Sequence, residues 1–158
     1  MYDTILHMAN TSDLKQICLA RAKSAKTLID AGDWDGAAYM MAYSLEVALK
    51  AASCVALRLD AYPERTSNKQ IDSCFMSHKF DQLLVISGLT DLFNITGSPQ
   101  AFRNWSDFVQ EFQGEWVNMR YNPQILANFD KIKVERLYQN LVEDKESIIN
   151  TIDGNKRW

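Results

Sequence analysis

The segment from Tyr39 to Ser53 (YMMAYSLEVALKAAS) constrains the fold most, because apolar residues occupy nearly every side of the helix that it would form. Its only charged residues are Glu46 and Lys50, spaced four apart so that their side chains meet on one helix face. A helix that is apolar around its whole circumference belongs in the middle of a bundle. The segment therefore predicts an all-α fold with one central helix that carries a largely buried ionic pair.

An amphipathic helix is expected before this segment. Apolar residues recur at three- and four-residue steps from Asp13 to about Ala31, and most of the charged residues fall on the other side. Gly32 suits the left-handed conformation that ends a helix, and Asp33 can cap a following helix over 34–59. The pattern predicts an antiparallel helical hairpin.

The second half of the chain predicts three more helices. Ser77 can cap a short helix that ends at Gly88, and a serine–proline start signal opens a long helix over 99–121. Pro123 prevents that helix from continuing, after which apolar positions predict a last long helix over 126–152. Together the patterns predict an up-and-down bundle of four long helices plus one short helix.

The length suits one domain. With 158 residues, 47% of them hydrophobic, the chain can bury a full core, and we expect a single helical domain over 1–158. The helical periodicity is lost over 60–77, which predicts a polar loop, and 154–158 is expected to be a flexible tail.

The charge balance limits the partners. A net charge of −3 and a pI near 5.4 exclude broad contact with a phosphate backbone, while leaving room for local contact with RNA. The acidic start of the chain and the lack of a long apolar run after it predict neither a signal peptide nor a membrane span. A cytoplasmic protein is therefore expected.

The cysteines and histidines predict no metal site and no cofactor. Cys18, Cys54 and Cys74 are odd in number and widely spaced, which favours free thiols, the first two of them buried in helices. His7 is isolated near the start of the chain and supplies no second ligand to His78.

Three groups of residues carry a resemblance to a known family. Aromatic and small residues precede an alanine-rich turn and a lysine in the central helix, 78–84 (HKFDQLL) begins with histidine, and an Arg-Tyr pair precedes Pro123. These groups resemble the HEPN domains of nucleotidyltransferase partners, abortive-infection proteins and toxin–antitoxin pairs, the central-helix residues being Tyr39, Ala42, Tyr43, Glu46, Ala48, Leu49, Lys50 and Ala51. The resemblance implies the bundle fold, a homodimer, and a nucleotidyltransferase-type protein, RNA or a nucleotide as partner.

Many HEPN proteins are metal-independent ribonucleases whose motif is an Arg, a polar residue next to it, and a His four to six positions after the Arg. Arg120 would be that Arg, but positions 124 to 127 are Gln, Ile, Leu and Ala. Without this imidazole the motif lacks its group for moving a proton. The sequence thus predicts a non-catalytic binding module. The alternative is a divergent ribonuclease in which Arg120, with Tyr121 and Asn122, acts across a dimer.

Each candidate residue also has a structural interpretation. Arg120 would lie at a helix C-terminus, where a cation is stabilised and can bond free carbonyl groups. If the bundle holds a nucleotide or another small molecule, Glu46, Lys50 and His78 are the expected ligand-binding residues, the Glu–Lys pair facing a groove between helices. His78 could equally be a hydrogen-bonded structural residue.

Two further interpretations concern aromatic residues. Trp34, Trp105 and Trp116 could stack on bases, but the last two are eleven residues apart, which favours a core or dimer-seam position on one helix face. Gly36, Ala37 and Tyr39 mimic part of one TPR repeat, which would indicate an adaptor protein. No 34-residue period recurs in the chain, so this interpretation is the weakest.

Overall fold

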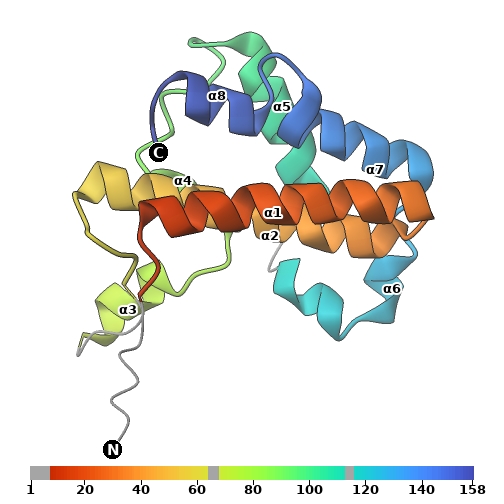
Figure 1. The fold of residues 1–158 in the computed structure, drawn as a ribbon, viewed down its shortest axis with the longest axis horizontal. Coiled ribbons are helices and arrows are strands. Elements are labelled where there is room, and N and C mark those ends of the chain that lie inside the picture. Colours follow the sequence, from red (N-terminus) through yellow and green to blue (C-terminus); the bar gives the residue numbers. More distant parts are fainter. Residues whose placement is uncertain (1–7, 64–67, 113–115) are drawn as a thin grey trace, which may run out of the picture.

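The computed structural model describes residues 8–63, 68–112 and 116–158. These residues form helices joined by turns and loops, without any strand, which confirms the all-α prediction (Figure 1). The elements are α1 (Thr11–Ala31), α2 (Trp34–Leu57), α3 (Lys69–Phe75), α4 (Phe80–Ile86), α5 (Pro99–Gln110), the 3₁₀ helix η1 (Trp116–Arg120), α6 (Pro123–Leu126), α7 (Lys131–Tyr138), the π-helical turn η2 (Gln139–Glu143) and α8 (Ile148–Gly154).

Helices α1 and α2 form the predicted antiparallel hairpin (Figure 1). Asn10 caps α1 through its side chain, which accepts a hydrogen bond from the Asp13 backbone N–H at 2.9 Å. Gly32 ends α1 with a φ of 78°, a conformation that costs glycine little. Asp33 then caps α2 by accepting from the Gly36 N–H at 3.0 Å. Local capping chemistry thus sets both ends of the turn.

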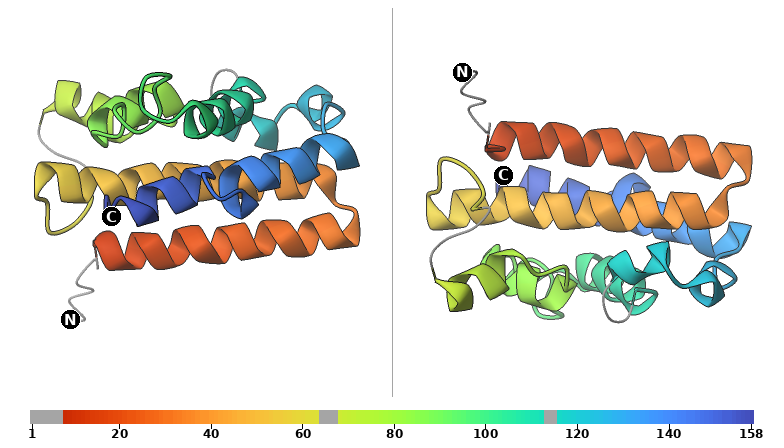
Figure 2. Two further views of the ribbon diagram at one scale, coloured as in Figure 1. Left: turned by 90° about the horizontal axis from the view of Figure 1, so that it is seen from above. Right: turned by 90° about the horizontal axis from the view of Figure 1, so that it is seen from below.

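Helix α2 is the central helix. It contacts α1, α4, α7, α8 and η1. Figure 2 shows α1 along one side of α2, the segment from α3 to η1 along the opposite side, and the C-terminal helices along a third. Small residues let these neighbours approach closely, and the buried ones include Ala37, Ala38, Ala42, Ala48, Ala51 and Ala52.

The apolar character of α2 has a second interpretation, as a membrane span. By length and composition this helix qualifies as a membrane span, a test that the core helix of a soluble protein also passes. Within the protein, 67% of its most apolar 18-residue window is buried. The expected lack of a membrane span therefore stays a prediction.

The long helix predicted over 99–121 is wrong. α5 ends at Gln110, Glu111 and Phe112 form a turn, and Trp116–Arg120 is the 3₁₀ helix η1. The apolar stripe continues regardless of this break, because Phe112, Trp116 and Met119 are all buried. Tertiary packing of these side chains therefore outweighs the local preference for one continuous helix.

The last long helix predicted over 126–152 is also wrong, since α6, α7, η2 and α8 share that range. One interruption lies between η2 and α8. There Ser147 is buried and caps α8 by accepting from the Asn150 N–H, and the Asn104 amide donates to the Glu146 carbonyl at 2.8 Å. These hydrogen bonds satisfy backbone carbonyl and N–H groups that would pair with one another in a continuous helix.

Parts of two segments predicted to be irregular carry helical structure or side-chain hydrogen bonds. Helix α3 lies within the predicted polar loop over 60–77, capped by Asn68, whose side chain accepts from two backbone N–H groups. Within the predicted tail over 154–158, Arg157 donates to both carboxylate oxygens of Asp91 and Trp158 donates to Asp153.

Candidate functional site

A buried carboxylate organises the centre of the molecule. Glu46, in the middle of α2, is 4% exposed. Its Oε1 accepts from Lys50 Nζ at 2.7 Å, and its Oε2 accepts from Trp116 Nε1 at 2.9 Å and lies 2.9 Å from His78 Nδ1. Removing an unpaired carboxylate from water is very costly, and these three partners compensate for it. The bonds join α2 to η1 and to the segment that precedes α4.

His78 lies outside the helix that was expected to contain it. The α4 N-cap is Lys79, which makes no side-chain capping bond, so His78 precedes the helix. Its side chain is 40% exposed. An ionised carboxylate only accepts hydrogen bonds, so a hydrogen bond to an ionised Glu46 requires the tautomer that carries its proton on Nδ1. In the neutral ring the other nitrogen, Nε2, is then an acceptor.

A groove of about 500 Å³ opens beside this network. Four aromatic residues line it: Tyr39, Tyr43, Tyr62 and Trp116. Four residues with other ionisable side chains also line it: Glu46, Lys50, His78 and Arg120. Trp116 meets Tyr39 edge-on with ring centroids 5.0 Å apart and stacks with Tyr43 at 6.1 Å. The groove therefore combines flat aromatic surfaces with ionisable side chains from separate elements.

Tyr62 closes one part of this groove. Its hydroxyl donates to the Phe75 carbonyl at 2.7 Å, and Lys50 Nζ lies 5.3 Å from the centre of its ring. Burial raises the pKa of Tyr62 well above its ordinary value, and the nearby Glu46 charge adds a smaller increase. The phenol thus stays protonated and holds its donor role at any physiological pH.

Arg120 reaches the groove from the end of η1. Its Nε donates to the Val117 carbonyl at 3.3 Å, the helix-terminal bond that its structural interpretation predicted. Among the described residues no carboxylate lies within ion-pair distance of its guanidinium. Lys50 and Arg120 together outweigh Glu46, so the groove lining carries a net positive charge. Such a site favours an anion.

The other two candidate catalytic residues lie apart from the groove lining. Tyr121 is 82% exposed, with its ring 5.7 Å from the Arg120 guanidinium carbon. Asn122 accepts from the Gln124 N–H at 3.1 Å, which is turn chemistry. The structure therefore brings Glu46, Lys50 and His78 together, adds Arg120, and leaves Tyr121 and Asn122 outside.

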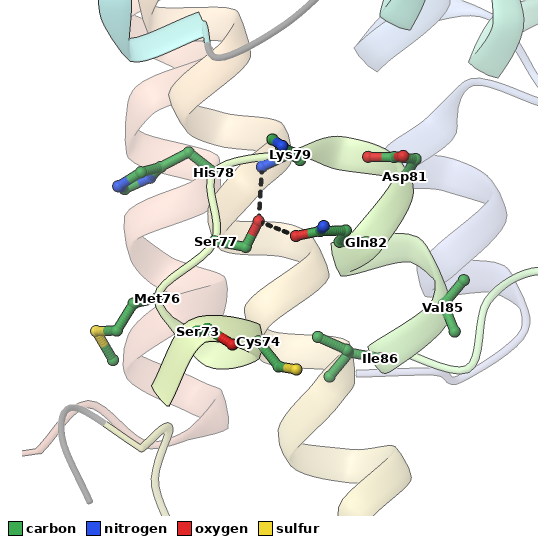
Figure 3. Close-up of a pocket in the computed structure, with 10 residues that line it drawn as sticks. All are labelled: Ser73, Cys74, Met76, Ser77, His78, Lys79, Asp81, Gln82, Val85 and Ile86. Atoms are coloured by element: carbon green, nitrogen blue, oxygen red, sulfur yellow. Dashed lines mark hydrogen bonds between the residues drawn. The ribbon is translucent and has the colours of Figure 1, made fainter. Parts of the chain in front are cut away.

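A second hollow, of about 780 Å³, lies between α3 and α4 (Figure 3). In it Ser77 Oγ donates to Gln82 Oε1 at 2.6 Å and accepts from the Lys79 N–H at 3.1 Å. The exposed Cys74 also lines it. His78 lines this hollow too, on the side opposite Asp81, Val85 and Ile86 (Figure 3).

The remaining sequence predictions concern cysteine, tryptophan and metal. Cys18 and Cys54 are buried free thiols as predicted, and burial raises the pKa of Cys18 to about 12. Trp105 and Trp116 are buried, the former stacked on Phe93. His7 lies outside the described residues, among which no group of three or more His, Cys, Asp or Glu side chains could hold a metal ion.

Sequence reasoning missed that Trp116 binds the site carboxylate, since its position in an apolar stripe indicated only burial. Comparisons of the chain with protein-family models, characterised proteins and solved structures find no match. Functional conclusions therefore depend on the chemistry of the groove.

Proposed function

We propose that this protein is a HEPN-like helical bundle that binds a nucleotide or a short single-stranded RNA in the groove between α2 and η1. The observation that carries the proposal is the Glu46 network, which holds Lys50 and Trp116 at the wall of a groove. The groove also contains the Arg120 guanidinium, which has no carboxylate partner among the residues that the structure describes. In this module the Arg120 motif binds the ligand without cleaving it.

The chemistry of the lining supports this ligand class. Bases stack on aromatic side chains, a contact worth about 1–3 kcal/mol per base. Trp116 packs against the rings of Tyr39 and Tyr43, and all three aromatic side chains also line the groove. The Arg120 guanidinium matches the geometry of phosphate oxygens. The net charge of −3 and the limited groove volume favour a short ligand over a long duplex.

The setting of this module follows from the resemblance to HEPN domains. We propose a cytoplasmic homodimer that works with a nucleotidyltransferase-type partner or within a toxin–antitoxin or defence system. The exposed Tyr121 beside Arg120 supplies a flat contact surface next to the groove mouth.

Binding can be measured with a fluorescein-labelled five-nucleotide single-stranded RNA and, in competition, with AMP. Arg120→Ala should weaken RNA binding by about 10- to 100-fold, because a charge-assisted hydrogen bond contributes about 1.5–3 kcal/mol. Arg103→Ala is the matched control, an exposed arginine on α5 outside the groove lining. Equal affinities of wild type and Arg120→Ala would refute the proposal.

The rival function is cleavage of RNA by Arg120 acting across a dimer, which the exposure of Arg120 and Tyr121 favours. Metal-free incubation with mixed transfer and messenger RNA distinguishes it. Intact RNA with wild type and with Arg120→Ala agrees with a binding module. Cleavage that Arg120→Ala abolishes, and that mixing with a second inactive variant restores, would establish the rival.

A further inference from the structure

We propose that Asp35 recognises the base of the bound nucleotide and selects guanine. The inference rests on the proposed binding of a nucleotide or short RNA and deepens it, because it names the base that the site prefers. It assigns a role to the turn hollow, a cavity of about 500 Å³ beside the turn between α1 and α2. Residues of α1, α2 and η1 line this hollow, among them Leu28, Asp35, Met40 and Met119.

The turn hollow adjoins the groove. Tyr39 and Arg120 line both cavities, so a ligand can extend from one into the other past these two side chains. The Arg120 guanidinium has no carboxylate partner among the described residues, and its planar group of donors suits a phosphate. A phosphate bound there lies between the cavities. The base of the same nucleotide can then enter the turn hollow, while a second nucleotide of an RNA occupies the groove.

Asp35 supplies the turn hollow with a carboxylate that is available to a ligand. It lies in the first turn of α2, where the helix N-terminus stabilises a negative charge. Within the described part of the chain this carboxylate forms no ion pair and accepts no hydrogen bond. Asp33, the other carboxylate in the lining, already caps α2 by accepting from the Gly36 N–H at 3.0 Å. The two oxygens of Asp35 are therefore the acceptors that a base can use.

Guanine is the base that matches this carboxylate. An ionised carboxylate only accepts hydrogen bonds, and its two oxygens can take two parallel N–H donors. Guanine presents such a pair, the ring N1–H and the 2-amino group, on adjacent atoms of one edge. Adenine and cytosine place an acceptor nitrogen beside their amino group, and uracil flanks its single N–H with two carbonyl oxygens, so each would set an acceptor against the carboxylate. The Tyr39 ring and the thioethers of Met40 and Met119 supply apolar contacts for the base.

The experiment measures how well nucleoside monophosphates displace a fluorescein-labelled five-nucleotide RNA from the full chain. IMP gives the sharpest comparison with GMP, because it retains N1–H and lacks only the 2-amino group. We expect GMP to compete about 10- to 100-fold better than IMP, since IMP loses one hydrogen bond to a charged group. AMP and UMP should compete still more weakly. This comparison uses the wild type, so it does not depend on the folding of any variant.

Variants identify the group that distinguishes the bases. Asp35→Asn should reduce the ratio of GMP affinity to AMP affinity by about 10-fold, because an amide pairs well with adenine. Asp107→Asn is the matched control, an exposed acid on α5 outside the lining of both cavities, and should keep the wild-type ratio. Arg120→Ala should weaken GMP and AMP by the same factor, since a phosphate contact carries no base information.

The outcomes separate guanine recognition from the binding function. Equal competition by GMP, IMP and AMP overturns guanine recognition and leaves the binding module standing. A preference for GMP that Asp35→Asn leaves unchanged also overturns it, because another group must then contact the base. Failure of the wild type to bind either the RNA or any of the nucleotides overturns both proposals. A preference for GMP that depends on Asp35 supports both.

Discussion

The α1–α2 hairpin and the Glu46 network are stabilised in different ways. Buried positions of α1 recur every three or four residues and face the small side chains of α2, so the hairpin follows from hydrophobic periodicity and helix caps. The network depends on a few polar bonds between α2, η1 and the residue before α4. The stability of the hairpin is therefore distributed over many apolar contacts. The stability of the network depends on one carboxylate.

The largest expected effect is on the network. Glu46→Leu replaces the buried carboxylate by an apolar side chain. It removes the acceptor of Lys50, whose side chain is 18% exposed, and of the Trp116 indole. Removing one partner of a buried pair costs about 3–5 kcal/mol of unfolding free energy. Urea denaturation measures the loss. A change below about 1 kcal/mol would mean that water satisfies the partners and that the carboxylate does not organise the site.

The hairpin should respond to loss of packing. Leu49→Ala removes a fully buried side chain from α2 and should lower the unfolding free energy by about 2–5 kcal/mol. The matched control is Leu19→Ala on α1, where the side chain is 46% exposed and the change should stay within about 0.5 kcal/mol. Equal losses in the two variants would show that α2 is not the centre of the core.

A smaller effect tests the break that separates η2 from α8. Ser147 caps α8 through its hydroxyl, so Ser147→Ala should cost about 1 kcal/mol in the same denaturation assay. Asn150→Ala is a useful companion, because its amide donates to the carbonyls of Val142 and Asp144. Stabilisation by either change would indicate that a continuous last helix, as predicted from the sequence, is accessible to the chain.

The smallest expected effect concerns pH and the C-terminal residues. Hydrogen bonds from Arg157 lower the pKa of Asp91 below its ordinary value of 3.8. A lowered folded-state pKa contributes stability above the unfolded value, and this contribution is lost as pH falls through the folded value. Asp91→Asn should therefore be slightly less stable than wild type at pH 7 and show a smaller loss below about pH 4. Thermal melts across pH 2.5–7 in ~0.15 M salt measure the difference; parallel curves would contradict it.

The sequence predicted the hairpin well because its signals are local. Gly32, Asp33 and the α1 stripe act within a few residues of where they stand. The sequence also singled out Glu46, Lys50 and His78 as one place to look, and the structure brings them together. Their ligand stays a prediction.

The second half was predicted less well for a physical reason. Phe112, Trp116 and Met119 follow Phe108 at a helix-like spacing and are buried, although α5 ends at Gln110. The periodicity of apolar residues therefore predicts which side chains face the core. It does not predict the backbone conformation between them. The bond from Trp116 to Glu46 joins residues far apart in the chain, and no local pattern specifies it.

The most direct test of the account is an NMR titration that follows the four tryptophan indole N–H signals while the five-nucleotide RNA is added. Trp116→Phe assigns the signal of the indole that donates to Glu46, and Trp105→Phe assigns the one stacked on Phe93 outside the groove lining. We expect RNA to shift the Trp116 signal and to leave the Trp105 signal in place. An unchanged Trp116 signal at saturating RNA would contradict a ligand site between α2 and η1.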